Sequence, residues 1–220
     1  MGQGRRAADD ARTVWLFDLD NTLYPAESGL FGAVDERINR FLETHLGVCG
    51  SEADELRRRD HDAHGITLVG LMAEHRVDPD RYLDFVHDVP VRDYLAADPE
   101  LRTILAALPG RRAIFTNGSH RHATAVVRAL DLEGLFEAVF DIVALGYRPK
   151  PDPETYRTVL TRLGAAPRHT VLLEDLERNL APARELGMQT VLVGAATPSA
   201  SADFAIPTVK DLPSLLPLLA

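Results

Sequence analysis

Val14-Trp-Leu-Phe-Asp-Leu-Asp-Asn-Thr-Leu-Tyr-Pro25 is the stretch of this 220-residue chain from which its fold can be inferred. The first four residues are apolar without alternation, which is typical of a strand buried on both faces of a parallel sheet. Asp18 and Asp20 follow, and side chains at positions i and i+2 of an extended chain share a face. Two carboxylates held so close repel each other unless a cation lies nearby. The stretch therefore predicts a buried strand that ends at a charged site.

Short apolar runs of the same kind recur along the chain, and helical patterns separate the later ones. Strands that alternate with helices predict an α/β fold, a doubly wound parallel sheet with helices on both faces. The expected strands are residues 113–116, 139–143, 171–173 and 190–193, and the expected helices are residues 120–130, 153–163 and 176–186.

Residues 28–93 break this alternation, because they contain helical spacing of apolar residues such as Leu30, Val34 and Ile38 but no convincing strand. A segment of about 65 residues is well beyond a usual connection, which favours an inserted all-helical cap over a long helical connection on the same core. We expect a flexible tail at residues 1–12, an α/β core at residues 13–25 and 96–220, and the cap at residues 26–95.

Polar residues follow the other expected strands, at the edge where parallel sheets bind ligands. Thr116 and Asn117 end one strand, Glu174 and Asp175 end another, and Lys150 lies in a loop after a third. Together with the two aspartates they supply a nucleophilic carboxylate, a second carboxyl for proton transfer, oxygen ligands for Mg²⁺ and a cradle for a phosphoryl group. This combination predicts phosphoryl transfer through a covalent aspartyl phosphate.

The choice of lysine at position 150 supports that interpretation. The chain has 24 basic residues, of which Lys150 and Lys210 are the lysines, so 24 − 2 = 22 are arginines. A compact ammonium group fits between a carboxylate and a phosphate, where the wide guanidinium fork of arginine does not substitute for it.

Four segments resemble, in order and spacing, the motifs of the haloacid dehalogenase (HAD) superfamily. They are Asp18–Pro25, Phe115–Asn117, Lys150–Pro153 and Leu173–Asp175. The resemblance runs from Val14 to about Val193 and includes a helical cap after the first motif. The form Asp-Leu-Asp-Asn-Thr-Leu-Tyr-Pro is similar to that of the pyrimidine 5′-nucleotidase subgroup, as are the cap segments His64–Leu71 and His87–Pro90.

The resemblance implies a role for each motif residue. Asp18 would attack phosphorus, and Asp20 would protonate the leaving alcohol and then deprotonate the attacking water. The Mg²⁺ ligands would be the carboxylate of Asp18, the backbone carbonyl of Asp20, the carboxylate of Asp175 and, through water, Glu174. The phosphoryl oxygens would be bound by Thr116, Asn117 and Lys150. Asp20 argues against the dehalogenase branch, because a departing halide needs no proton.

The cap departs from the subgroup's pattern at three positions. Histidines stand at His61 and His64 where the subgroup tends to have tyrosine, and Val69 stands in place of arginine. The leading expectation is a Mg²⁺-dependent hydrolase of pyrimidine nucleoside 5′-monophosphates. A sugar phosphatase or phosphomutase on the same core is the alternative, and a non-catalytic phosphate- or nucleotide-binding protein is a further one.

Several other polar residues admit two interpretations. His61 with His64 and His120 with His122 lack a third ligand at a suitable spacing, so we expect no zinc site there. His120 is a candidate substrate contact, and Asn179 is either a support for the site or an ordinary surface residue. The run of arginines at residues 57–59 is either a solvated helix face or an attractor of anionic substrate.

Composition narrows the class of protein further. Hydrophobic residues make up 45% and charged residues 26% of the chain, as in ordinary globular proteins, and no run approaches the roughly 18 apolar residues of a membrane helix. The formal net charge of −9 makes a nucleic-acid polymer an unsuitable partner. The lone Cys49 cannot form an internal disulfide, which fits a reducing compartment. We expect a cytoplasmic monomer or homodimer whose partner is a small phosphorylated metabolite.

Overall fold

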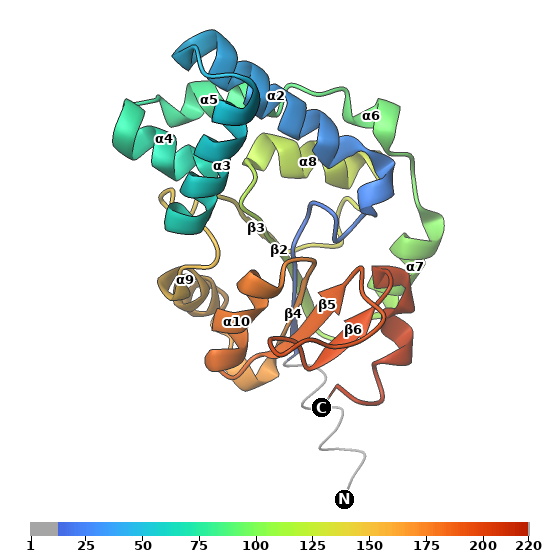
Figure 1. Cartoon of the computed structure of the whole chain (residues 1–220). Helices are drawn as coiled ribbons and strands as arrows, with labels where there is room; N and C mark the ends of the chain where they lie inside the picture. The colour runs from blue at the N-terminus through green and yellow to red at the C-terminus, as the bar shows by residue number, and fades with distance from the viewer. Residues whose placement is uncertain (1–12, 220) are drawn as a thin grey trace, which may run out of the picture.

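The computed structural model describes residues 13–219 and is built around a six-stranded parallel sheet in the order β3-β2-β1-β4-β5-β6 (Figure 1). The strands are β1 (Val14–Phe17), β2 (Arg111–Phe115), β3 (Ala138–Phe140), β4 (Thr170–Glu174), β5 (Gln189–Val193) and β6 (Phe204–Ile206). The predicted tail at residues 1–12 lies outside the described residues. The prediction of a doubly wound α/β fold is confirmed.

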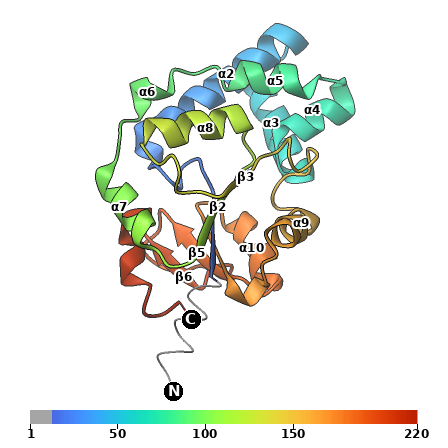
Figure 2. The ribbon, with the colours of Figure 1, turned by 180° about the vertical axis from the view of Figure 1, so that it is seen from behind.

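Helices cover both faces of the sheet, as Figures 1 and 2 show from opposite sides. The helices of the α/β part are α7 (Pro99–Ala107), α8 (His120–Ala129), α9 (Pro153–Leu163), η2 (Pro167–His169), α10 (Glu177–Glu185) and η3 (Val209–Ser214). Trp15 and Phe17 of β1 pack into one apolar cluster with α7, α8 and η3, whereas Val14 and Leu16 pack into another with α9 and α10. Burial on both faces explains why β1 has no polar alternation.

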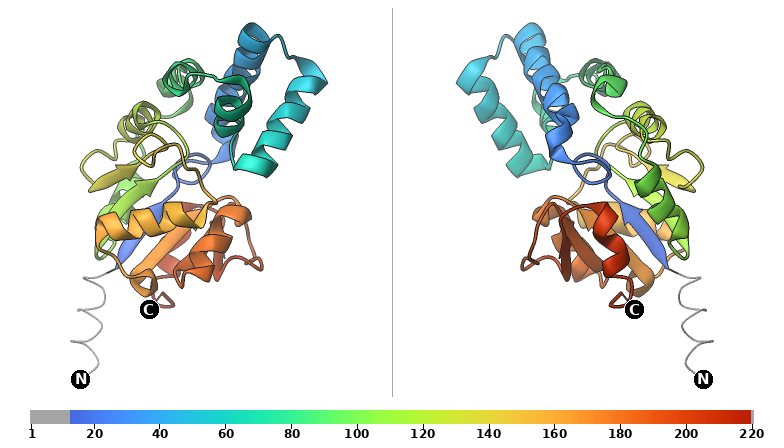
Figure 3. Two further views of the ribbon diagram at one scale, coloured as in Figure 1. Left: turned by 90° about the vertical axis from the view of Figure 1, so that its left-hand side faces the viewer. Right: turned by 90° about the vertical axis from the view of Figure 1, so that its right-hand side faces the viewer.

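Between β1 and α7 all regular elements of the chain are helical. The elements are η1 (Ala26–Ser28), α2 (Leu30–Leu46), α3 (Gly50–His64), α4 (Thr67–His75), α5 (Pro79–Val86) and α6 (Val91–Tyr94). Helices α2 to α5 share a third apolar cluster, which includes Phe41, Leu71 and Tyr82. We call residues 26–95 the cap, and their status as a separate domain stays a prediction. Figure 3 shows α2 to α5 beyond the end of the sheet at which β1 finishes.

The two ends of the cap lie side by side. A Cβ on Gly29, which has a φ of 79°, would stand 3.8 Å from the ring of Tyr94. Leu30 and Leu95, next to these two residues in the chain, are buried in the same core cluster as β1. The cap therefore leaves and rejoins the core at one place.

Two strands differ from the sequence prediction. The strand expected at residues 139–143 ends at Phe140, because the Asp141 side chain accepts the backbone N–H groups of Val143 and Ala144 and turns the chain out of the sheet. Ile142 then joins the apolar cluster of the cap. Strand β6 was not predicted, since its three residues are too few to form a pattern. Within residues 13–219, none of the helices has the length and apolar character needed to cross a membrane.

Candidate active site

The register of the sheet brings the ends of β1 and β4 together. Phe17 pairs with Leu173, so Asp18 and Glu174 follow at neighbouring positions, and the backbone N–H of Asp18 donates to the Leu173 carbonyl at 3.0 Å. This confirms that Glu174 and Asp175 come from a strand beside the one that supplies Asp18 and Asp20. The site lies where parallel sheets bind ligands, at the carboxyl ends of the strands.

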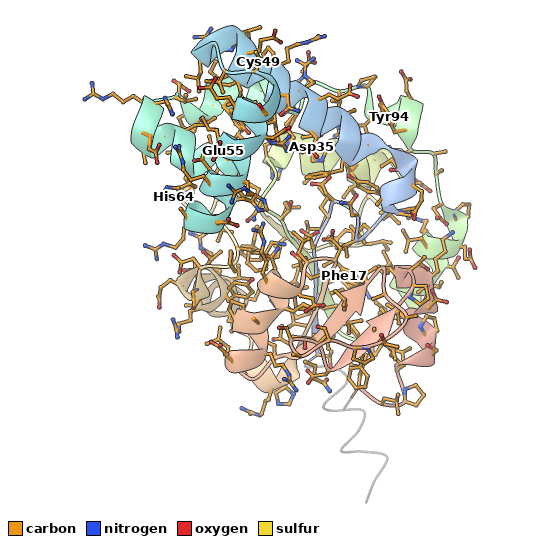
Figure 4. The ribbon with its side chains drawn as sticks, in the orientation of Figure 1. Phe17, Asp35, Cys49, Glu55, His64 and Tyr94 are labelled. Atoms are coloured by element: carbon orange, nitrogen blue, oxygen red, sulfur yellow. The ribbon has the colours of Figure 1, made fainter. Side chains whose placement is uncertain are left out.

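A cavity of about 510 Å³ lies between these strand ends and the cap. Its core lining includes Asp18, Asp20, Thr116, Asn117, Lys150, Glu174 and Asp175, and its cap lining includes Phe31, Val34, Ile38, Arg57, Arg58, His61 and Leu68. In Figure 4, Phe17 at the end of β1 lies below the cap helices that carry Asp35 and His64. All seven predicted core residues therefore line one cavity.

Lys150 connects two carboxylates at the base of the cavity. Its Nζ donates to Asp18 Oδ1 and to Glu174 Oε1, each at 2.7 Å, and its side chain is only 1% exposed. Burial opposes the charge on Lys150, but Asp18 and Glu174 outweigh it and hold the pKa of the ammonium group above its usual range. Burial raises the pKa of Asp18 well above its usual range, and Lys150 only partly offsets this. Lys150 alone therefore does not offset the cost of keeping the buried Asp18 ionised.

The donor set at this point suits a divalent cation. Asp18, Glu174 and Asp175 each place one oxygen within 4.8 Å of the others. Burial, followed by the charge of Glu174, raises the pKa of Asp175 to about 7. A hard cation such as Mg²⁺ takes carboxylate oxygens and relieves this kind of repulsion. The residues present therefore fit a divalent metal.

Both carboxylate oxygens of Glu174 already accept hydrogen bonds from the protein. Its Oε1 accepts from Lys150 and from the side-chain amide of Asn179, and its Oε2 accepts from the backbone N–H of Leu176 at 2.7 Å. Asn179 is thus buried against the site and holds one of its carboxylates, which answers the question that its sequence position left open. These contacts are consistent with the prediction that Glu174 reaches a metal through water.

Asn117 anchors the loop that carries Lys150. Its Oδ1 accepts the backbone N–H of Lys150 at 2.8 Å, and its Nδ2 donates to the Lys150 carbonyl at 3.1 Å. The Thr116 hydroxyl accepts the N–H of Gly118 at 2.9 Å, which folds the turn after β2 toward the cavity. The direct role of Thr116 and Asn117 at a phosphoryl group stays a prediction.

Asp20 has an environment unlike that of Asp18. Its Oδ1 accepts the hydroxyl of Tyr24 and lies 2.7 Å from Nε2 of His122. Burial opposes ionisation of Asp20, but the charge on His122 and the hydrogen bonds from His122 and Tyr24 prevail and lower the pKa of Asp20. Two carboxylates separated by one residue therefore have opposite electrostatic environments.

His122, and not His120, faces the site. The His120 side chain is 67% exposed and lies 3.3 Å from Asp141, outside the cavity lining, so the structure does not place it as a substrate contact. Residues two apart on a helix point to nearly opposite sides, so only one member of the pair could face inward. His122 lies on the same face as the buried Ala123 and Val126, and that periodicity was the available signal.

The run of arginines at residues 57–59 divides between two roles. Arg57 pairs with Asp35, donates to Asn39 at 2.9 Å and lines the cavity, as does Arg58. Arg59 instead bridges Asp60 and Glu74 on the outer side of the cap. Two of the three arginines therefore face the cavity.

The cap touches the core beside Lys150. Arg178 of α10 lies with Nη2 2.8 Å from His61 Nε2 and donates to the Gly65 carbonyl at 3.2 Å. Gly65 itself, with a φ of 84°, packs so closely that a Cβ there would stand 2.8 Å from the Lys150 carbonyl oxygen. Neither His61 nor Gly65 was singled out from the sequence as a contact between the cap and the core.

A family model described as haloacid dehalogenase-like hydrolase matches residues 13–187, well over half of the chain. The chain belongs to the haloacid dehalogenase-like hydrolases. The predicted family is therefore confirmed, and the four motifs of this hydrolase are the segments that converge on the cavity.

Curated relatives of this haloacid dehalogenase-like hydrolase include a phosphate metabolism protein and a phosphatase. One is phosphate metabolism protein 8 of Saccharomyces cerevisiae, 28% identical over 84% of this chain, although the alignment spans only 62% of the yeast protein. Another is the phosphorylated carbohydrates phosphatase of Thermotoga maritima, 28% identical over 80% of this chain and 82% of that protein. Among solved structures, L-2-haloacid dehalogenase of Xanthobacter autotrophicus matches with a TM-score of 0.62 at 20% identity, covering 94% of this chain and 99% of that one. That likeness concerns the fold.

Proposed function

We propose that this hydrolase is a Mg²⁺-dependent phosphomonoester hydrolase that works through an aspartyl phosphate. One observation carries the proposal: Asp18 lies against Lys150 among carboxylates, whereas Asp20 lies against His122 and Tyr24. The two carboxyl groups have different partners, an ammonium cation for Asp18 and two hydrogen-bond donors for Asp20, and this difference supports two roles, nucleophile and proton carrier. A departing alkoxide needs a proton and a halide does not, so a supported Asp20 favours a phosphate ester over a carbon–halogen bond.

In the proposed reaction a carboxylate oxygen of Asp18 forms a bond to phosphorus while the bond to the ester oxygen breaks. Asp20 gives its proton to that oxygen, and the alcohol leaves. Asp20 then takes a proton from the water that hydrolyses the aspartyl phosphate, which restores both carboxyl groups. Lys150 neutralises charge beside Asp18, and Thr116 with the backbone N–H groups that follow holds the phosphoryl oxygens.

The proposed direct ligands of Mg²⁺ are the carboxylates of Asp18 and Asp175 and the backbone carbonyl of Asp20. Glu174 is proposed to reach the ion through a water molecule. The bound ion would supply positive charge that stabilises the developing negative charge on the phosphoryl oxygens. The three clustered carboxylates support this assignment.

Pyrimidine nucleoside 5′-monophosphates are the leading substrate proposal. Apolar side chains from the cap, including Phe31, Val34 and Leu68, line the cavity opposite the carboxylates. An apolar wall suits a flat base better than a polyhydroxylated sugar, and 510 Å³ is within the usual range for a small-molecule site. Arg58 also lines this cavity, where it pairs with Glu55 and Asp62.

A sugar phosphatase or phosphomutase is the second candidate. It is supported by similarity to the Thermotoga maritima phosphatase and by 31% identity over 43% of this chain to β-phosphoglucomutase of Bacillus subtilis. A mutase would return an isomer and little free phosphate. A protein that only binds phosphate would show no metal-dependent turnover.

The test is release of inorganic phosphate from UMP, CMP, AMP, several sugar phosphates and an aryl phosphate, with Mg²⁺ and with a chelator. We expect metal-dependent release that favours UMP and CMP. Release from sugar phosphates alone would replace the nucleotide proposal, and no release by a folded sample would refute hydrolysis. Asp18→Asn keeps the shape of the side chain and removes the nucleophile, so we expect no turnover from it. Residual turnover above a few per cent of wild type would contradict the aspartyl phosphate.

A further inference from the structure

His122 is buried behind Asp20 and has no route to substrate. Its side chain is 0% exposed, and that of Asp20 is 15% exposed. Nε2 of His122 lies 2.7 Å from Asp20 Oδ1, and the hydroxyl of Tyr24 donates to the same oxygen. One oxygen of this carboxyl group is therefore held from two sides.

The other ring nitrogen of His122 indicates which way the hydrogen bond runs. Nδ1 is buried and has no hydrogen-bond partner within residues 13–219. An unpaired buried N–H group costs more than an under-used acceptor, so in the neutral ring the proton belongs on Nε2, and in the charged ring Nε2 carries a proton as well. His122 then donates to Asp20 Oδ1, as Tyr24 does.

With Oδ1 held, the other oxygen of Asp20, Oδ2, lies near the turn after β2, and Asp20 is among the residues that line the cavity. A Cβ on Gly118 would stand 3.7 Å from Asp20 Oδ2 and 3.2 Å from the Thr116 hydroxyl oxygen. Oδ2 is thus on the side of the turn after β2, where the phosphoryl group of a substrate is expected. An oxygen on that side is free to exchange a proton with an ester oxygen or with water.

A second histidine supports this arrangement from the cap. His87, directly after α5, stacks on His122 with ring centroids 4.6 Å apart and planes 19° apart. Its Nδ1 lies 3.0 Å from the hydroxyl of Ser119, which also accepts the backbone N–H of His122 at 3.3 Å. The ring of His122 is therefore fixed both by its own helix and by the cap.

We propose that His122, together with Tyr24, is a positioning residue for proton transfer: the two side chains hold Oδ1 of Asp20 so that Oδ2 meets the leaving oxygen. This inference rests on the proposed function. As the phosphorus–oxygen bond breaks, its electron pair goes to the leaving oxygen, which takes the proton from Oδ2. The negative charge left on Asp20 is stabilised by the two donors at Oδ1.

The experiment compares phenyl phosphate with 4-nitrophenyl phosphate, two esters of similar shape. Phenolate is a strong base and needs a proton as it leaves, whereas 4-nitrophenolate is a much weaker base and leaves without one. The measured quantity is kcat/KM, because it reports the steps up to departure of the phenol and excludes hydrolysis of the phosphoenzyme. Variants are made in the full chain with Mg²⁺ present.

His122→Leu removes the donor and keeps a similar volume. Misplacement of a proton donor by a fraction of an ångström costs roughly 100-fold in rate, so kcat/KM for phenyl phosphate should fall about 100-fold. For 4-nitrophenyl phosphate it should fall less than about fivefold, because no proton is required. His122→Gln restores an N–H near the position of Nε2 and should recover most of the loss.

Two further variants separate positioning from folding. Tyr24→Phe removes the other donor to Oδ1, so the same preference for 4-nitrophenyl phosphate should result even if His122→Leu does not fold. His120→Leu changes an exposed histidine on the same helix and should leave both esters within about twofold of wild type.

Equal losses on the two esters, or no loss on either, in both His122→Leu and Tyr24→Phe would overturn the positioning role and leave the phosphatase intact. Failure of the wild type to hydrolyse either ester would refute the proposed function, and the positioning role with it. The ratio of kcat/KM for the two esters in the variants tests the positioning role of His122. Turnover of the esters by the wild type tests the proposed phosphatase function.

Discussion

His87 should make the protein sensitive to mild acid. Burial lowers the pKa of His87 to about 3, with the charge of His122 and of Arg121 adding to the effect against the opposing attraction of Asp20. A histidine in an unfolded chain has a pKa of about 6.5. Below that pH, His87 binds a proton in the unfolded state but not in the folded state. The free energy of unfolding is therefore unaffected by protonation of His87 above pH 6.5 and decreases as the pH falls below it.

The size of the effect follows from the two pKa values. Between pH 6.5 and pH 5 the loss is 1.5 pH units at about 1.36 kcal/mol each, or about 2 kcal/mol of unfolding free energy. His87→Gln keeps a polar partner for Ser119 and cannot take up a proton, so it lacks this loss.

The assay is urea unfolding of wild type and His87→Gln at pH 7 and at pH 5. Groups that do not interact with His87 contribute equally to both proteins, so subtracting the pH effect in the variant from that in the wild type leaves the effect of His87 and of its coupling to His122 and Asp20. We expect a remainder of about 2 kcal/mol, with the wild type losing more. A remainder below about 0.5 kcal/mol would refute the conclusion that His87 is held uncharged by its surroundings.

Two other predictions concern Lys150 and the contact beside it. Lys150→Met leaves the carboxylates of Asp18 and Glu174 buried without a cation, which should lower the free energy of unfolding by about 3–5 kcal/mol at pH 8 and abolish turnover. This loss of unfolding free energy should be smaller at pH 5, because burial keeps the pKa of Asp18 high and its charge is then partly neutralised. A loss under about 1 kcal/mol at pH 8, measured by urea unfolding, would contradict the conclusion that the ion pairs of Lys150 stabilise the fold. Gly65→Ala places a Cβ 2.8 Å from the Lys150 carbonyl oxygen and should lower kcat/KM about tenfold on every substrate. Gly47→Ala is the control, since Gly47 also has a positive φ but nothing within 4 Å; equal activity losses in the two variants would exclude a specific role for the contact.

The sequence was informative wherever a pattern repeats or a charge has no packing explanation. Strands β1 and β4 are unalternating apolar runs, and each leads into carboxylates that packing alone would not place there. Asp18, Asp20 and Asp175 were predicted as neighbours for that reason, and the sheet places β1 beside β4.

The remaining features depend on contacts between distant segments. Glu174 contacts Lys150 only because a loop from residues 141–151 returns to the sheet, and no local pattern encodes that path. His87 and His122 are 35 positions apart and stack across the junction of cap and core. The subgroup suggested by the first motif stays a prediction, because substrate choice depends on how the cap packs over the cavity.

The adjacency of Gly29 and Tyr94 has an evolutionary consequence. A segment whose two ends meet can be exchanged for another of different length at little cost in chain entropy, and the strands need not shift. The groups proposed to act on the ester lie in the sheet and its loops, while the cap residues that line the cavity lie within that one contiguous segment. Replacement of the segment between these two positions, which adjoin in space, would therefore change the substrate-binding wall and leave the residues proposed to carry out the reaction unchanged.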